Sequence, residues 1–280
     1  MVREGYTTIN PIAIANIDEN LLNRQKLNGN FYIDIKPIKQ IDLHSELDYD
    51  IGNSRSEQWR PTYDFGPAVQ RPINSIAWQK NDNLWWAFKN YATYSDTFGK
   101  HALTAMLGQE VWESVWEYQR ISASNLPGNE IKNPQLGDTD TYSLADGMGD
   151  NAMVSFFTRE TYNYDDRYLL TYTFRRDGSS SFGPNNRWAS FHSVAGSWRF
   201  SNELFLRDHP VLTNGKLRIG WGQTGNSSIG AGLWDASLQM FPTALGAGYK
   251  QSQIANPYVQ WETQEQWNLG LDLSFWHNRI

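Results

Sequence analysis

The sequence predicts an all-β protein, specifically part of an antiparallel up-and-down transmembrane β-barrel with about nine strands. Three observations lead to this fold class. Apolar and polar residues alternate along many segments, as in half-buried strands. Long and short connections between these segments also alternate. The segments often exceed the ~5–6 residues of a typical globular strand and reach the ~9–11 residues that a tilted strand needs to cross a bilayer.

The clearest alternation lies in residues 266–275. Successive strand residues point to opposite faces, so one face of this segment is apolar and the other is polar or small. The apolar face would carry Trp267, Leu269, Leu271, Leu273 and Phe275. Other strands are predicted, from the start of the chain to its end, at 29–36, 41–51, 83–95, 101–118, 151–164, 168–176, 187–200 and 216–221.

The connections between the predicted strands supply the second argument. Every second connection is long, which is typical of outer-membrane barrels with short periplasmic turns and longer outer loops. A soluble β-sandwich rarely needs several unstructured loops of ~30 residues. Short turns are predicted at 37–40, 96–100 and 164–167, and a longer link at 201–215 with a helical turn at 202–207. Long connections are predicted at 52–82, 119–150 and 222–262, with one of medium length at 177–186.

Composition excludes several function classes. The 280 residues include 13 Trp, 14 Tyr and 13 Phe, an aromatic content that suits membrane–water interfaces and also sugar-binding surfaces. A net charge of -6 without a basic stripe argues against nucleic-acid binding. The absence of cysteine removes disulfides and thiol chemistry. No apolar run approaches the ~18 residues of a transmembrane helix, and the start of the chain does not read as a signal peptide.

A long block of the sequence closely resembles one family. Residues 164–188 read YDDRYLLTYTFRRDGSSSFGPNNRW, and residues 216–226 read KLRIGWGQTGN. Together with 191–200, 256–263 and the early 10–13, these segments resemble the barrel of the SusC/RagA family of TonB-dependent receptors. The strong match covers about residues 150–280, and the earlier part agrees in pattern more than in letters.

The resemblance implies an active transporter in the outer membrane of a Bacteroidota-type Gram-negative bacterium. Such proteins import glycans or peptides through a plugged barrel of ~22 strands and are not enzymes. The implied partners are a SusD-like surface lipoprotein that acts as a lid, the TonB–ExbB–ExbD complex and outer-membrane lipid. No cofactor is implied.

Residues 1–280 are therefore expected to be part of the barrel domain, without the family's plug domain, TonB box or signal peptide. Nine strands would leave two unpaired sheet edges, which do not occur in lipid. We expect a fragment, a truncated product or a portion of a longer chain. A complete small barrel is the alternative, but its expected even strand number and the ending in mid-pattern argue against it.

The remaining motifs favour no catalytic or metal site. Residues 220–225 match G-x-G-x-x-G, but no helix follows to hold a pyrophosphate. The five histidines lack the spacing of metal ligands. Glu110, Glu113 and Glu117 suggest paired glycosidase carboxylates, but a solvated loop base is expected instead.

Tryptophans of the predicted outer loops are the candidates for substrate contact, because flat aromatic faces stack on sugar rings and on peptide side chains. The alternatives are an interfacial girdle, loop packing or contact with the lid. Arg175, Arg218 and Asp272 are predicted to face the lumen, since an arginine on the lipid face costs ~2–4 kcal/mol at mid-membrane. The candidate tryptophans are Trp59, Trp78, Trp112, Trp116, Trp234 and Trp261.

Two other functions stay open at this point. A soluble all-β carbohydrate-binding module or hydrolase would fold as a monomer without detergent and bind glycans unaided. A passive porin fragment is the third possibility, and the family signature argues against it.

Overall fold

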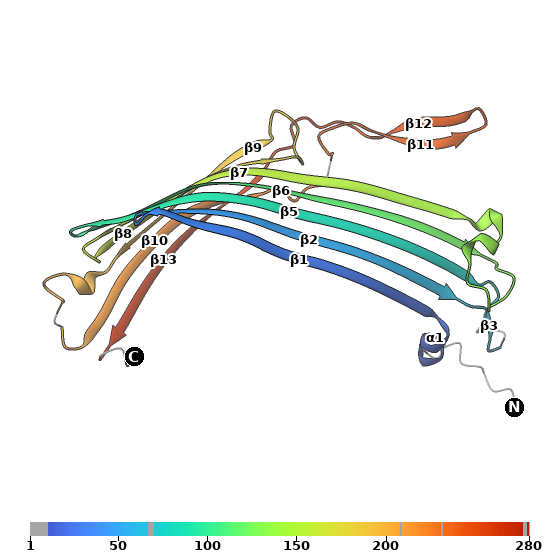
Figure 1. Ribbon diagram of the computed structural model, residues 1–280, viewed down its shortest axis with the longest axis horizontal. Helices are drawn as coiled ribbons and strands as arrows, with labels where there is room; N and C mark the ends of the chain where they lie inside the picture. Colours follow the sequence, from blue (N-terminus) through green and yellow to red (C-terminus); the bar gives the residue numbers. More distant parts are fainter. Residues whose placement is uncertain (1–10, 67–69, 208, 231, 277–278, 280) are drawn as a thin grey trace. The chain divides into compact units, whose positions relative to one another are not determined.

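The computed structural model describes residues 11–66, 70–207, 209–230, 232–276 and 279. Nine strands form one sheet, and neighbours in the sheet follow one another along the chain (Figure 1). This up-and-down order confirms the predicted fold class. The strands are β1 (Glu19–Ile38), β2 (Ile41–Arg60), β5 (Ser75–Phe98), β6 (His101–Ser124), β7 (Ser143–Tyr164), β8 (Tyr168–Ser179), β9 (Trp188–Trp198), β10 (Leu212–Asn226) and β13 (Glu262–Phe275).

Smaller elements lie in the connections. Strands β3 (Tyr63–Asp64) and β4 (Gln70–Arg71) pair within the β2–β5 connection, and β11 (Ser237–Thr243) pairs with β12 (Gly246–Gln253) between β10 and β13. In the described part of the chain, no helix is long and apolar enough to cross a membrane. The helical elements are α1 (Pro11–Ile17), η1 (Pro134–Leu136), η2 (Thr139–Thr141) and η3 (Phe200–Asn202).

Two predicted long loops are wrong in extent. Strand β2 continues to Arg60 and β5 begins at Ser75, so most of the predicted loop 52–82 is strand. Likewise, β6 ends only at Ser124 and β7 begins at Ser143, within the predicted loop 119–150. These extensions carry polar residues on both faces and therefore lack the period-two signal. The predicted helical turn at 202–207 is confirmed, because Arg207 N–H donates to the Glu203 carbonyl at 2.9 Å after η3.

The chain divides into two compact units. Strands β1, β2, β5, β6 and β7 each contribute one portion to each unit. In the first unit, a small core is built from Trp59, Ile76, Ala123 and Leu126, with Trp78 packed against it. The first unit contains residues up to 29, 49–85 and 114–150, and the second contains 30–48, 86–113 and 151–280.

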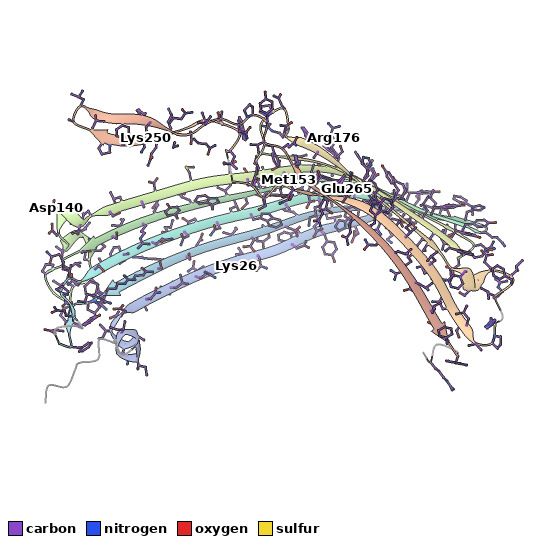
Figure 2. All side chains as sticks on the ribbon, turned by 180° about the vertical axis from the view of Figure 1, so that it is seen from behind. Lys26, Asp140, Met153, Arg176, Lys250 and Glu265 are labelled. Atoms are coloured by element: carbon purple, nitrogen blue, oxygen red, sulfur yellow. The ribbon has the colours of Figure 1, made fainter. Side chains whose placement is uncertain are left out.

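In the second unit, strand registers define two different faces. Leu217 of β10 lies opposite Trp198 of β9 and Leu271 of β13, and Ile219 lies opposite Leu269. This face is apolar and exposed, since Leu269 retains 77% of its accessible surface. Side chains project from the strands to both sides (Figure 2). The alternation predicted for 216–221 and 266–275 is thus present in the paired strands.

Candidate functional site

The polar face of the second unit contains an ion-pair network around Arg175. Its Nε donates to Asp177 Oδ1 at 2.7 Å, and its Nη2 donates to Ser155 Oγ at 2.8 Å and to Glu110 Oε2 at 3.2 Å. The guanidinium also lies 5.9 Å from the Phe157 ring centroid. Three strands, β6, β7 and β8, are therefore joined through one cation.

The other two residues predicted to face the lumen lie further along the same sheet. Arg218 of β10 and Asp272 of β13 form a two-pronged contact, with Nε to Oδ2 at 2.8 Å and Nη2 to Oδ1 at 2.8 Å. Such a fork holds the guanidinium and carboxylate planes together. Arg175 lies opposite Phe191, and Arg218 lies opposite Ser197. Because 191 and 197 have the same parity on β9, all three predicted residues share the polar face.

A groove of about 720 Å³ lies over β8, β9, β10 and β13. Most of its lining residues belong to the polar face. Small side chains dominate its floor, and glycine within a strand permits another group to approach the backbone closely. Lys216, Arg218 and Asn268 supply its polar groups. The small lining residues include Ser193, Ala195, Ser197, Gly220, Gly222 and Gly270.

A third polar group joins β1, β2 and β5. Asp48 accepts from Lys89 Nζ at 2.7 Å and from Asn30 Nδ2 at 2.6 Å. His44 Nδ1 lies 2.6 Å from Asp34 Oδ1, and the His44 ring stacks on Tyr91 with 4.5 Å between centroids. The sequence analysis did not name Lys89 as a candidate, although it lies in the predicted strand 83–95.

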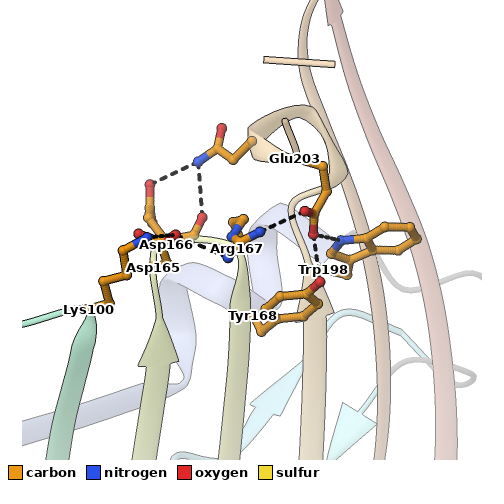
Figure 3. Close-up of polar contacts among 8 residues, drawn as sticks. Lys100, Asp165, Asp166, Arg167, Tyr168, Trp198 and Glu203 are labelled. Atoms are coloured by element: carbon orange, nitrogen blue, oxygen red, sulfur yellow. Dashed lines mark hydrogen bonds and ion pairs between the residues drawn. The ribbon is translucent and has the colours of Figure 1, made fainter. Parts of the chain in front are cut away.

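A cluster of charged residues surrounds the short β7–β8 turn, and the sequence analysis did not predict it (Figure 3). Glu203, just after η3, accepts from Arg167 Nη1 at 2.7 Å, from Tyr168 Oη at 2.6 Å and from Trp198 Nε1 at 3.0 Å. The hydrogen bonds from Tyr168 and Trp198, with the Arg167 cation beside them, lower the pKa of the Glu203 carboxyl. We call Lys100, Asp165, Asp166, Arg167, Tyr168, Trp198, Arg199, Asn202 and Glu203 the turn clasp.

The β7–β8 turn is shaped to present both of its carboxylates to the turn clasp. Asp165 and Asp166 have positive φ angles of 52° and 53°, as the two central residues of a type I′ turn require. Asp165 accepts from Lys100 Nζ at 3.0 Å, and this bond lowers its pKa. Asp166 pairs with Arg199, and its carbonyl accepts from Asn202 Nδ2 at 3.1 Å.

Comparison with known proteins gives a consistent answer. No protein-family model matches the chain. TonB-dependent receptor P3 of Formosa agariphila is 30% identical over 278 residues, which cover 97% of this chain and 27% of the relative. TonB-dependent receptor SusC of Bacteroides thetaiotaomicron is 28% identical over 281 residues, with 97% and 27% coverage.

A solved structure titled as the RagAB peptide transporter superposes with a TM-score of 0.87 and 29% identity. The match covers 95% of this chain and 30% of that one. The chain is homologous to the SusC/RagA-type TonB-dependent receptors. It spans 27% of the length of P3 and of SusC. The open nine-stranded sheet superposes on part of a TonB-dependent receptor barrel.

In the structure, four of the six candidate tryptophans lie on strands, so their prediction as loop residues is wrong. Trp59, the residue before the last of β2, has only 2% of its surface exposed, which leaves no ring face for a ligand. Trp78 of β5 packs against the same core, with the Arg55 guanidinium 5.6 Å from its ring. Trp112 and Trp116 lie within β6.

The other two tryptophans do lie in connections. The Trp261 ring stacks on Phe182 with 4.9 Å between centroids, and its Nε1 donates to the Arg187 carbonyl at 3.1 Å. Trp234 lies close to Gly183. Both rings are thus engaged in loop packing. Their contact with a substrate remains a prediction.

Glu110, Glu113 and Glu117 also lie within β6, so their expected position at a loop base is wrong. Glu110 belongs to the Arg175 network, and Glu113 accepts from Trp86 Nε1 at 3.1 Å. Glu117 accepts from Gln119 Nε2 at 2.9 Å. The predicted strand ended at residue 118, but β6 continues to Ser124, so the loop begins only after the three glutamates.

Proposed function

We propose that this chain forms barrel wall of an outer-membrane TonB-dependent importer of glycans or oligopeptides. The observation that carries the proposal is the difference between the two sheet faces. One face exposes Leu217, Ile219, Leu269 and Leu271 together, which suits contact with lipid. The opposite face contains the Arg175 network and the Arg218–Asp272 pair, which suits a polar lumen.

In this proposal the turn clasp lies at the periplasmic rim. Outer-membrane barrels have short periplasmic turns and longer outer loops. The β1–β2, β5–β6 and β7–β8 connections are all short turns. The connections 61–74, 125–142 and 227–261 would then lie on the outer side.

The proposed partners follow from the relatives. A SusD-like lipoprotein would cover the outer side, and the TonB–ExbB–ExbD complex would supply energy through parts of the receptor that this chain does not represent. The wall itself would bind and guide substrate without catalysing a reaction. The relatives named SusC and RagAB support these assignments by homology.

A soluble carbohydrate-binding module or hydrolase is the second candidate, and the apolar face argues against it. Trp267, Leu269 and Leu271 retain 70%, 77% and 59% of their surface. They continue across neighbouring strands into Ile219 and Leu217. Soluble monomers rarely expose so continuous an apolar patch.

Cell fractionation and uptake test the proposal. The chain is expressed with whatever flanking sequence its gene encodes, and its gene is deleted in a parallel strain. We expect the protein in the outer-membrane fraction and loss of uptake of one class of labelled oligomer, glycan or peptide. A protein that stays soluble, folds cooperatively without detergent and is dispensable for uptake of both classes would contradict the proposal.

A further inference from the structure

Trp116 and Tyr118 of β6 lie side by side with parallel rings. They are two residues apart and therefore share one face of the strand. Their ring planes differ by 10°, and the centroids are 6.1 Å apart. We call these two rings the aromatic platform.

The adjacent strand β7 leaves space for both rings. A Cβ added at Gly149 would lie 2.8 Å from the Trp116 indole, and one added at Gly147 would lie 2.5 Å from Tyr118 Cε1. Any side chain at these two positions would displace the rings. Gly147 and Gly149 are two residues apart, as are Trp116 and Tyr118. Each ring therefore packs against backbone that has no side chain at that position.

The other side of the platform is accessible. Trp116 retains 42% of its surface although its indole covers Gly149. Asp146 and Asp150 differ in parity from the two glycines, so they project to the opposite face of β7. On β6, Ser114 and Arg120 flank the platform at the same parity. Parity thus places a hydroxyl side chain at one end of the platform and a guanidinium side chain at the other.

We propose that the aromatic platform binds two neighbouring sugar rings of a glycan. The inference rests on the proposed import function and selects glycan over peptide. The apolar C–H face of a pyranose stacks on an aromatic ring, and two parallel rings offer two such positions in a row. Peptides are usually held by backbone hydrogen bonds at a sheet edge or by side-chain pockets, and the platform lies on β6, within the sheet between β5 and β7.

Intrinsic fluorescence titration tests this proposal. The chain with its gene-encoded flanking sequence, in detergent micelles, is titrated with linear hexaoses of glucose, xylose, mannose and galactose, and with decapeptides rich in Gly, Ala and Ser. We expect at least one hexaose to bind, and Trp116→Ala to weaken that binding about tenfold, a loss of ~1.4 kcal/mol. Trp116→Phe, which keeps a flat ring, should recover part of the affinity.

Trp188→Ala is the matched control. Trp188 is also 42% exposed and also covers a glycine, Gly178, but it belongs to β9. It should leave hexaose binding unchanged. Gly149→Val should weaken binding as Trp116→Ala does, because it lifts the indole without removing it.

Two results would overturn the proposal. One is the absence of binding by every hexaose, and the other is hexaose binding that Trp116→Ala and Gly149→Val leave unchanged. If decapeptides bind and are taken up by cells while hexaoses do neither, the platform proposal fails but import stands. If deletion of the gene leaves uptake of both glycans and peptides unchanged, the proposed function itself fails.

Discussion

Arg167 Nη1 lies 2.7 Å from Glu203 Oε2, and this ion pair ties the β7–β8 turn to the link that follows β9. The side chains of Arg167 and Glu203 are only 19% and 12% exposed. Tyr168 and Trp198 donate to the other carboxylate oxygen. One side chain therefore joins the ends of β8 and β9 to the start of the link toward β10.

Substitution Glu203→Gln should lower the thermal stability of the folded chain. The neutral amide loses the charge that pairs with Arg167, while its size is unchanged. We expect Tm to fall by about 2–4 °C. Glu265→Gln is the control, because the Glu265 side chain is exposed and accepts a hydrogen bond from Gln223 Nε2 at 2.8 Å. Equal Tm values for the two variants would contradict a stabilising clasp.

The turn clasp also predicts how stability depends on pH. The pKa of Glu203 is lowered by the hydrogen bonds from Tyr168 and Trp198, and that of Asp165 by Lys100. A carboxyl whose folded pKa is lowered stabilises the fold above its unfolded pKa, and this contribution is lost as pH falls through the folded pKa. Tm of the unmodified chain should therefore be flat above about pH 5 and fall toward pH 3.

The same titration on Glu203→Gln separates the clasp from other carboxyls. The gap in Tm between the unmodified chain and the variant should be constant near neutral pH and should narrow in acid. A gap that stays the same down to pH 3 would show that ionised Glu203 does not stabilise the fold.

Gly108→Ala should destabilise the second unit. The added Cβ would meet the Phe157 ring and would lie 2.8 Å from Tyr91 Cβ. Overpacking of this kind typically costs ~1–3 kcal/mol. Gly52→Ala is the matched control, because a Cβ there meets nothing within 4 Å. Urea unfolding in lipid vesicles measures both, and equal midpoints would contradict close packing at Gly108.

Arg175→Leu should cost about 1–2 kcal/mol, because it leaves the nearly buried Asp177 carboxylate without its cation. Arg159→Leu serves as the control. Arg159 lies opposite Thr173 on the same face and has no ion pair among the residues that the structure describes. If the two variants unfold at the same urea concentration, the Arg175 network contributes nothing beyond a surface charge.

Much of the sheet could be predicted from sequence, because apolar and polar residues alternate along its strands. Segment 266–275 shows the pattern strongly, and its pairing with β10 keeps Leu271 opposite Leu217. The portions of β2, β5 and β6 that belong to the first unit lack this alternation. Polar residues on both faces look like loop, so Trp59 and Trp78 were placed in the predicted loop 52–82.

The candidate site was predictable only in part. Arg175, Arg218 and Asp272 follow from strand parity, and their placement on one face agrees with it. The turn clasp depends largely on contacts between residues far apart in the sequence, such as Asp166 with Arg199, 33 positions apart, and Lys100 with Asp165, 65 positions apart. The aromatic platform depends on the register between β6 and β7, which sequence spacing alone does not determine.

The most direct test asks whether the two faces of β13 meet lipid and lumen. The sequence contains no cysteine, so single cysteines at 267–272 are unique labelling sites. Each is labelled with bimane in vesicles whose lipids carry brominated acyl chains, which quench adjacent fluorophores. Strong quenching at 267, 269 and 271, with weak quenching at 268, 270 and 272, is the predicted result. Uniform quenching, or none at any position, would contradict a barrel wall.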